Sequence, residues 1–217
     1  TTYRKLLFMN DLNRLAIVIP LYKKDFFEET LNSICNQTDK RFNLYIGNDA
    51  SSSDFEEIIK SYKEKFDFTY QFFKNNLGGE GRLVEQWERC IALSNNEEYI
   101  QILGDDDVIS ENFVAEFYKN LPKIQSENIS AIKFSHNIVD ENKTILHTIT
   151  TDETIIPAPE LFKRKYKGLM PSSLSENIFA LSAYKKHHFL KIPFAWGADD
   201  YAILTFSGLD SVFYLSD

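Results

Sequence analysis

Residues 99–107 read YIQILGDDD, an apolar run that ends in three consecutive carboxylates. The run at residues 99–103 is typical of a strand buried on both faces of a sheet. Adjacent carboxylates at the end of a buried strand repel one another, so they lower stability unless a divalent cation lies among them. Mg²⁺ and Mn²⁺ bind carboxylate and phosphate oxygens together, often through only one or two protein carboxylates. The stretch therefore predicts a cation-binding turn; the alternative is a solvated turn that precedes a helix starting at Asn112.

Three strand–helix units precede this stretch, each an apolar run followed by apolar residues at helical spacing. The strands and helices are expected at residues 15–21 and 26–37, 42–47 and 54–66, and 68–73 and 82–93. Asp25 is expected to cap the first helix, and Ser53 with Glu56 fits a capping box for the second. Strands that alternate with helices predict an α/β fold with a mixed, mainly parallel sheet flanked by helices. A ligand is then expected at the carboxyl ends of the strands.

The second half of the chain is less regular. It is expected to hold a helix at residues 112–121, a strand at 131–135, strand or hairpin segments up to Ile156, a proline-bearing connection at 157–171 and a last strand at 212–215. An amphipathic segment at residues 201–206 follows the acidic pair Asp199-Asp200. The chain shows no internal repeat, so a single domain over residues 1–217 is the prediction.

The composition is that of an ordinary globular protein, with 43% hydrophobic and 26% charged residues in a chain of 217. The formal net charge of -8 argues against nucleic acid as a partner, because phosphate backbones select for clustered lysine and arginine. The only cysteines are Cys35 and Cys90, which favours packed thiols in a reducing compartment over a disulfide framework.

No run approaches the roughly 20 apolar residues that a membrane-spanning helix needs, and residues 1–13 lack the apolar core of a signal peptide. The sequence therefore predicts a cytoplasmic protein. Basic clusters at residues 163–165 and 185–188 could meet the inner face of the plasma membrane or a lipid-diphosphate acceptor. The alternative is that both clusters are ordinary solvated faces.

The order of these elements resembles the GT-A fold of inverting nucleotide-sugar glycosyltransferases, in particular glycosyltransferase family 2 of the bacterial surface-polysaccharide type. The resemblance is carried by the first strand with Tyr22, the helix end Asn36-Gln37-Thr38, the strand end Asn48-Asp49-Ala50-Ser51 and the turn Gly104-Asp105-Asp106-Asp107. It covers residues 14–121 well and 178–215 more loosely. It implies a nucleotide-sugar-binding half at residues 14–121 and an acceptor-binding half at 122–217.

The resemblance also implies a donor site. Pro20 and Tyr22 match positions that line the base pocket, where an aromatic ring offers a face for uracil. Asp49 matches the residue that accepts a hydrogen bond from the base, and Arg82 matches a basic position near the nucleotide. Asp105 matches the residue that meets the ribose or the metal. The expected donor is a nucleotide sugar, with UDP-sugars favoured, although Tyr22 is equally typical of an ordinary aromatic and Asp49 of a turn residue.

The resemblance assigns roles within the acidic turn as well. Asp106 matches the principal ligand of a divalent cation, Mn²⁺ or Mg²⁺, and Asp107 matches a second ligand. This chain departs from the family pattern at four positions. Gly104 and Asn48 stand where an aspartate is usual, Ala50 where a glycine is usual, and Lys23 where an asparagine is common. The metal site is therefore expected to be built from the three remaining aspartates of the turn.

Inverting transfer needs a base that takes the proton of the acceptor hydroxyl. The pair Asp199-Asp200 resembles the family's acidic pair before a helix, in which the second member is the base. Asp200 is therefore the expected base, and Asp199 orients the acceptor or holds Asp200. The acceptor implied is a hydroxyl of a glycan or of a lipid-linked saccharide. The alternative is that both carboxylates only stabilise the start of a helix.

Two other functions compete with this interpretation. A sugar nucleotidyltransferase also needs a parallel sheet, a metal and a base pocket, but it usually has a glycine-rich, basic loop after its first strand. This chain has Leu21-Tyr22-Lys23-Lys24 there. The other alternative is a non-catalytic carbohydrate- or cation-binding module with a degenerate site. Metal-dependent turnover of a nucleotide sugar distinguishes a transferase from such a module.

Overall fold

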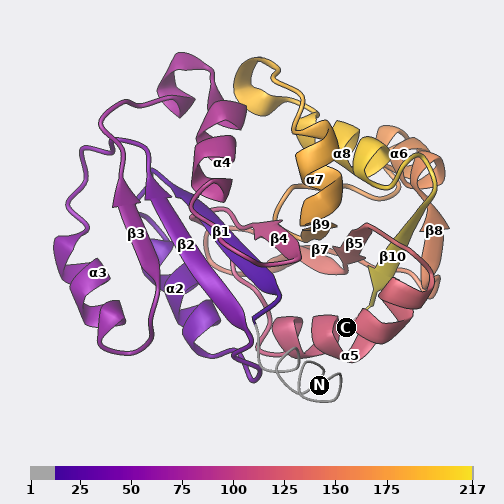
Figure 1. Ribbon diagram of the computed structural model, residues 1–217, viewed down its shortest axis with the longest axis horizontal. Helices are drawn as coiled ribbons and strands as arrows, with labels where there is room; N and C mark the ends of the chain where they lie inside the picture. Colours follow the sequence, from indigo (N-terminus) through magenta and orange to yellow (C-terminus); the bar gives the residue numbers. More distant parts are fainter. Residues whose placement is uncertain (1–12, 217) are drawn as a thin grey trace, which may run out of the picture.

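A mixed sheet of eight strands crosses the molecule in the computed structural model, which describes residues 13–216 (Figure 1). The strand order is β3-β2-β1-β4-β9-β5-β10-β8. In that order the strands span Thr69–Phe72, Phe42–Asn48, Leu15–Leu21, Tyr99–Ile102, Asn177–Ala180, Ala131–Phe134, Ser211–Leu215 and Ile155–Pro157.

The directions of the strands confirm a mainly parallel sheet. Strands β3, β2, β1 and β4 run parallel to one another, and β10 runs parallel to β5. β9 is antiparallel to both of its neighbours, β4 and β5, and β8 is antiparallel to β10. The carboxyl ends of β1, β2 and β4 therefore lie at the same end of the sheet, where a ligand is expected.

Helices cover both faces of this sheet (Figure 1). Because side chains alternate along a strand, Leu15 and Ile17 of β1 enter one core, and Ala16 and Val18 enter the other. The first core includes residues of α2 (Phe27–Cys35), α3 (Glu56–Lys63) and α5 (Phe113–Ser126). The second includes residues of α4 (Leu83–Ile91), α6 (Ala158–Tyr166), α7 (Leu181–His187) and α8 (Ala198–Phe206).

The two predicted helix caps are wrong. Phe26, rather than Asp25, is the N-cap of α2, with φ 66°, and no side chain caps that helix. The N-cap of α3 is Phe55, again without a side-chain cap, so Ser53 and Glu56 do not form a capping box. The N–H of Glu56 instead donates to Asp54 Oδ1 at 2.9 Å. The short side chain of an aspartate can accept a hydrogen bond from a backbone N–H two residues further along the chain.

The second half is more regular than expected. The predicted connection at residues 157–171 contains α6, which carries a proline in its first turn. A proline is tolerated there, because the first N–H groups of a helix have no partner within the helix. Helix α5 continues through Pro122 to Ser126, and β9 and α7 were not predicted.

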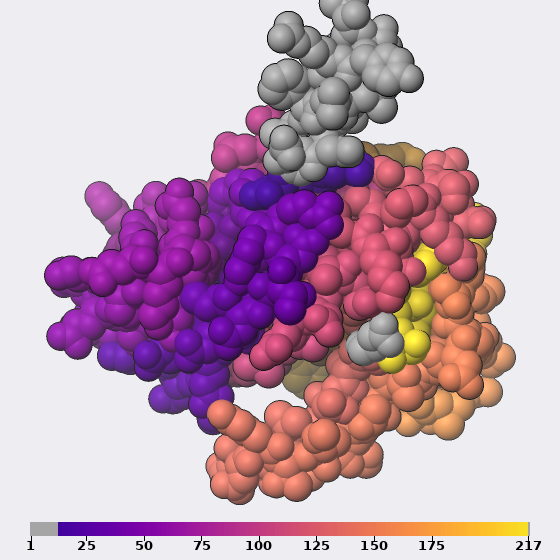
Figure 2. All heavy atoms as spheres, turned by 90° about the horizontal axis from the view of Figure 1, so that it is seen from below, coloured from indigo at the N-terminus to yellow at the C-terminus, as the bar shows by residue number. Residues whose placement is uncertain are grey.

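The hairpin expected before Ile156 is present as β6 (His136–Val139) and β7 (Ile145–Ile149), which pair in a separate two-stranded sheet. Figure 2 shows this segment as a lobe at the lower edge of the molecule. Lys143, in its turn, pairs with Glu29 of α2 at 3.0 Å. Within residues 13–216, no helix has the length and apolar character that crossing a bilayer requires.

Candidate active site

Three loops meet at the carboxyl ends of β1, β2 and β4, and Asp105 joins two of them. Its Oδ2 accepts hydrogen bonds from the backbone N–H groups of Tyr22 and Lys23, each at 2.7 Å. Ser51, in the loop after β2, donates to the carbonyl oxygen of Tyr22 at 2.6 Å. Burial raises the pKa of Asp105, whereas the two backbone hydrogen bonds lower it. Asp105 therefore fixes the loop that carries Tyr22 against the acidic turn.

Asp106 points outward from the same turn. Its side chain is 43% exposed, and its Oδ2 lies 3.2 Å from the ammonium nitrogen of Lys23. The charge of Asp106 and the hydrogen bond that it accepts raise the pKa of Lys23. A cationic group is thus drawn to the carboxylate that the sequence assigns as the principal metal ligand.

Asp107 turns toward the second half of the chain. Its Oδ2 accepts a hydrogen bond from Ser175 Oγ at 2.5 Å, and the same hydroxyl accepts the N–H of Gly104 at 3.0 Å. A Cβ atom at position 104 would lie 2.7 Å from Asp107 Oδ2. The glycine that replaces the family's usual aspartate therefore leaves room for this arrangement. Desolvation raises the pKa of Asp107, and the hydrogen bond from Ser175 lowers it.

The donor atoms of the turn suit a hard divalent cation that takes only part of its coordination from the protein. Asp106 and Asp107 offer carboxylate oxygens, and the ammonium of Lys23 already lies against the first of them. Between residues 13 and 216, no three His, Cys, Asp or Glu side chains are placed to hold a metal by themselves. Such a site fits Mg²⁺ or Mn²⁺ when phosphate oxygens complete the coordination shell.

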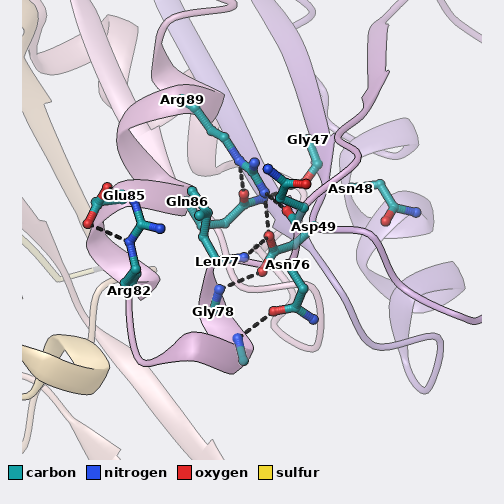
Figure 3. A network of polar contacts seen from close by, with 12 residues as sticks. Gly47, Asn48, Asp49, Asn76, Leu77, Gly78, Arg82, Glu85, Gln86 and Arg89 are labelled. Atoms are coloured by element: carbon teal, nitrogen blue, oxygen red, sulfur yellow. Dashed lines mark hydrogen bonds and ion pairs between the residues drawn. The ribbon is translucent and has the colours of Figure 1, made fainter.

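Asp49 lies at the end of β2 and is only 2% exposed (Figure 3). Its Oδ1 accepts the N–H of Leu77 and its Oδ2 the N–H of Gly78, both at 2.8 Å. Arg89 of α4 forms an ion pair with Oδ1 and donates to the carbonyl of Asn75 at 2.8 Å. Asp49, predicted to bind the base, thus holds the loop at residues 75–81 in place. Its partner Arg89 was missed, because a charged residue on a predicted helix gives no sign of what it faces.

Arg82 precedes α4 at the other end of that loop. Its guanidinium pairs with Glu85 at 2.5 Å and with Glu80 at 3.3 Å, and it remains about half exposed. A hollow of about 540 Å³ lies beside it. The hollow is lined by Asn75, Asn76, Leu77, Gly79, Glu80 and Arg82. Arg82 can therefore reach an anion at the loop, although its charge is partly neutralised by the two glutamates.

Pro20 and Tyr22 lie where β1 ends. Pro20 pairs in register with Gly47 of β2, next to the strand end that carries Asp49. The Tyr22 side chain is 47% exposed, while its backbone is fixed on both sides by Asp105 and Ser51. An exposed ring on a fixed backbone is suited to stacking against a planar ligand.

Asp199 and Asp200 lie in the first turn of α8, whose N-cap is Gly197 with φ 81°. Both carboxylates contact the ammonium of Lys165 in the last turn of α6, at 3.1 Å and 2.7 Å. Burial raises the pKa of Asp200, and Lys165 lowers it. Lys165 was interpreted only as part of a basic cluster, because the sequence does not show that α6 packs against α8.

A buried ion pair lies next to this acidic pair. Lys133 of β5 and Glu176 are 2.6 Å apart, with side chains 2% and 4% exposed. Ser172 and Ser173 also donate to Glu176, at 2.9 Å and 2.7 Å. The segment at residues 172–176 therefore links the acidic turn, through Ser175, to the surroundings of the acidic pair. Sequence patterns did not reveal it, because a lysine inside a short apolar strand carries no sign of its partner.

The fold and the carboxylates at its strand ends define a class, the GT-A glycosyltransferase fold with an acidic turn after its fourth strand. The family model described as glycosyl transferase family 2 matches residues 16–192. The chain therefore belongs to glycosyl transferase family 2.

Individual relatives are more distant. The chain is 25% identical over 140 residues to an uncharacterized glycosyltransferase of Rickettsia bellii (strain RML369-C), an alignment that covers 64% of this chain and 19% of that protein. It is 24% identical over 127 residues to glycosyltransferase GlyA of Streptococcus pneumoniae serotype 4 (strain ATCC BAA-334 / TIGR4), covering 58% of this chain and 17% of that protein. The aligned regions thus cover less than a fifth of the length of either relative.

Solved structures share the fold at low identity. S. aureus TarS 1-349 has a TM-score of 0.69 at 15% identity, covering 94% of this chain and 58% of that chain. The mannosyltransferase PcManGT from Pyrobaculum calidifontis has a TM-score of 0.63 at 13% identity, covering 95% and 55%. Glucosyl-3-phosphoglycerate synthase from Mycobacterium tuberculosis has a TM-score of 0.60 at 14% identity, covering 94% and 70%. These similarities establish the GT-A architecture.

Proposed function

We propose that this chain transfers a sugar, with inversion, from a nucleotide-sugar donor to a hydroxyl of a glycan or lipid-linked acceptor. The observation that carries the proposal is the junction at Asp105, which joins the acidic turn to the loop of Tyr22 at the carboxyl end of the sheet. UDP-sugars are the favoured donors. The structure of TarS 1-349 in complex with UDP-GlcNAc and that of the mycobacterial synthase with Mn²⁺ and UDP support this choice.

Within this proposal, Pro20, Tyr22 and Asp105 bind the nucleoside, and Arg82 meets an anionic part of the donor. Asp49 acts mainly by holding the loop at residues 75–81, because its carboxylate is almost fully buried among the amides of that loop and Arg89. For Asp49 to accept a hydrogen bond from the base, this loop would have to move.

Asp106 and Asp107 would hold a divalent cation together with the donor diphosphate. A bound cation supplies electrostatic stabilisation of the negative charge that grows on the departing nucleoside diphosphate. The ammonium of Lys23 can lie near the same negative charge, since its side chain already reaches Asp106. The complexes of PcManGT with GDP-Man and Mn²⁺ and of the mycobacterial synthase with Mn²⁺ support this part of the proposal.

Asp200 acts as the base and Asp199 as its neighbour that orients the site. As the acceptor oxygen bonds to the anomeric carbon, its proton passes to Asp200, and the bond from that carbon to the diphosphate breaks. One displacement of this kind inverts the configuration and needs no covalent enzyme intermediate. The alternative role of the two carboxylates is to stabilise the start of α8 through the helix dipole. That role needs no cation, whereas both carboxylates contact the ammonium of Lys165.

The acceptor half is proposed to include residues 122–217. The basic cluster at residues 163–165 is not free to meet a membrane surface, since its side chains are paired within the protein. Lys163 contacts Glu160 at 3.3 Å, and Arg164 contacts Glu153 at 2.6 Å. A contact with an anionic lipid surface at the inner face of the plasma membrane would therefore depend on the cluster at residues 185–188.

The test is turnover of UDP-, GDP- and dTDP-sugars with Mn²⁺, measured as release of the nucleoside diphosphate. We expect Asp106→Ala to lower metal-dependent turnover by about 100-fold or more, since it removes an electrostatic contact to the developing charge. Asp152→Ala, which removes an exposed carboxylate outside the site, is the matched control and should retain full activity. A wild-type protein that neither binds nor turns over any of these donors with Mn²⁺ would contradict the proposal.

A further inference from the structure

Lys165 reaches from the last turn of α6 to the first turn of α8 and contacts two carboxylates at once. Its ammonium lies 2.7 Å from Asp200 Oδ1 and 3.1 Å from Asp199 Oδ2. The three side chains are only partly accessible, at 27% for Lys165, 17% for Asp200 and 13% for Asp199. Lys165 also lines a small cavity with Asp200, Lys133 and Ser172. This cluster is more enclosed than an ordinary surface ion pair.

The charges that face Asp200 come from three other elements besides its own helix. Asp199 lies beside it on α8, Lys165 faces it from α6, and Lys133 and Glu176 face the cluster from β5 and the segment before β9. Lys133 lies 2.6 Å from Glu176, so its charge is already matched. Lys165 is the cation that contacts both remaining carboxylates.

Two neighbouring carboxylates with little solvent around them do not both stay ionised without a compensating charge. The pKa of Asp200 lies above its usual value, because desolvation and the charge of Asp199 raise it more than the hydrogen bond donated by Lys165 lowers it. A base must be ionised before it can accept a proton. The ion pair with Lys165 therefore affects the ionisation of Asp200, on which its proposed role as the base depends.

We propose that Lys165 is a positioning residue that keeps Asp200 ionised and oriented toward the acceptor. This inference rests on the proposed function, since it names the group that controls the proposed base. It also gives Asp199 a role, because Asp199 retains the ammonium when Asp200 becomes neutral.

The reaction step balances without any proton on or off Lys165. The acceptor hydroxyl gives its proton to Asp200 as its oxygen bonds to the anomeric carbon, and the electron pair of the breaking bond leaves with the nucleoside diphosphate. Lys165 stays an ammonium throughout, paired with Asp199 after Asp200 is protonated. An ion pair that only joined α6 to α8 would make the same contacts, so the test must read the ionisation of Asp200 directly.

The experiment compares Lys165→Met, which removes the charge at similar length, with Lys165→Arg, which keeps it. Lys163→Met is the matched control, because it removes from the same helix a lysine whose ammonium pairs with Glu160. The pKa of Asp200 is followed by ¹³C NMR of protein labelled at aspartate Cγ, with the signal assigned by its loss in Asp200→Asn. The pH profile of kcat/KM for Mn²⁺-dependent hydrolysis of UDP-GlcNAc is measured on the same proteins.

We expect Lys165→Met to raise the pKa of Asp200 by about one unit or more, because an adjacent cation lowers a carboxyl pKa by that amount. The acidic limb of the kcat/KM profile should move to higher pH by the same amount. Lys165→Arg and Lys163→Met should leave both close to wild type. Lys165→Gln, a second uncharged variant, provides the comparison if Lys165→Met does not fold.

The inference is overturned if the Asp200 signal titrates at the wild-type pH in the uncharged variants, or if Lys165→Arg shifts it as much as they do. The NMR titration needs no substrate. A shifted Asp200 in a protein that turns over no nucleotide sugar would therefore contradict the proposed function alone. An unshifted Asp200 in an active enzyme would contradict only the role of Lys165.

Discussion

Ala50 occupies a backbone conformation that favours glycine, with φ 54° in the loop after β2. The family pattern usually has glycine at this position, and the structure gives the physical reason. An L-residue in the left-handed region brings Cβ close to the following carbonyl oxygen and raises the energy by roughly 1–2 kcal/mol. The loop after β2 therefore carries strain next to Asp49 and Ser51.

Ala50→Gly should relieve this strain. We expect the free energy of unfolding to rise by about 0.5–1 kcal/mol, since the relief exceeds the added entropy of glycine in the unfolded chain. Urea unfolding followed by circular dichroism measures the change. Ala92→Gly, at the right-handed C-cap of α4 with φ -64°, is the control and should lower stability instead. Equal effects of the two substitutions on the free energy of unfolding would contradict backbone strain at Ala50.

Gly47 shows a different requirement, a close approach between β2 and α4. A Cβ atom there would overlap the sulfur of Cys90 and lie 2.8 Å from the ring of Phe73. We expect Gly47→Ala to lower the free energy of unfolding by about 1–3 kcal/mol, because a well-packed core does not accept an added methyl group. Adding Cys90→Ala should restore part of the loss in the same urea titration; an unchanged or larger loss would contradict this explanation.

At the level of elements, the ion pair of Lys133 and Glu176 joins β5 to the segment that enters β9. Removing one partner leaves the other charge buried and unpaired. We therefore expect Glu176→Gln to lower the free energy of unfolding at pH 7 by about 3–5 kcal/mol. Replacing both residues, as Lys133→Met with Glu176→Leu, should recover most of this loss, since no charge is then buried. Denaturation of the three proteins side by side provides the measurement.

The same pair predicts a pH dependence. Burial acts to raise the pKa of Glu176, but the charges of Lys133 and His136 outweigh it and lower the pKa from 4.5 to about 2. A carboxyl with a lowered folded-state pKa stabilises the protein above its unfolded pKa and loses that effect as pH falls. Stability should therefore decline between about pH 4.5 and pH 2. Glu176→Gln should show a flatter profile there, and an unchanged profile would contradict this assignment.

At the scale of the whole molecule, the two halves of the chain share one sheet and both of the cores that pack against it. β9, from the second half, pairs with β4 of the first. Ile132, Ile178 and Phe213 belong to the same core as residues of α2 and α5. The proposed donor and acceptor halves are therefore parts of one packed unit.

A fragment of residues 13–121 should not fold on its own. It would expose the edge of β4 and the apolar face of α5 that the second half covers, and exposed edges and apolar patches favour association. We expect no cooperative urea transition for the fragment, whereas the whole chain should show one. A cooperative transition of the fragment would contradict the shared core.

The sequence by itself determined the elements whose signal is local. Apolar runs bounded by polar residues predicted the first four strands, and their alternation with helical spacing predicted the parallel sheet, because burial on one or both faces repeats along the chain. The acidic turn was evident because three adjacent carboxylates lie directly after a buried run. The helix α6 and strand β9 were missed, since prolines mark the first as a loop and β9 is only four residues long.

Only the tertiary structure decided which charges meet. Lys165 and Asp199 are 34 residues apart in the chain, Lys133 and Glu176 are 43 apart, and Asp107 and Ser175 are 68 apart. A pairwise contact at such separation leaves no periodic pattern, because it depends on how whole elements pack. The sequence therefore predicted a set of candidate carboxylates, and the fold decided which groups contact them.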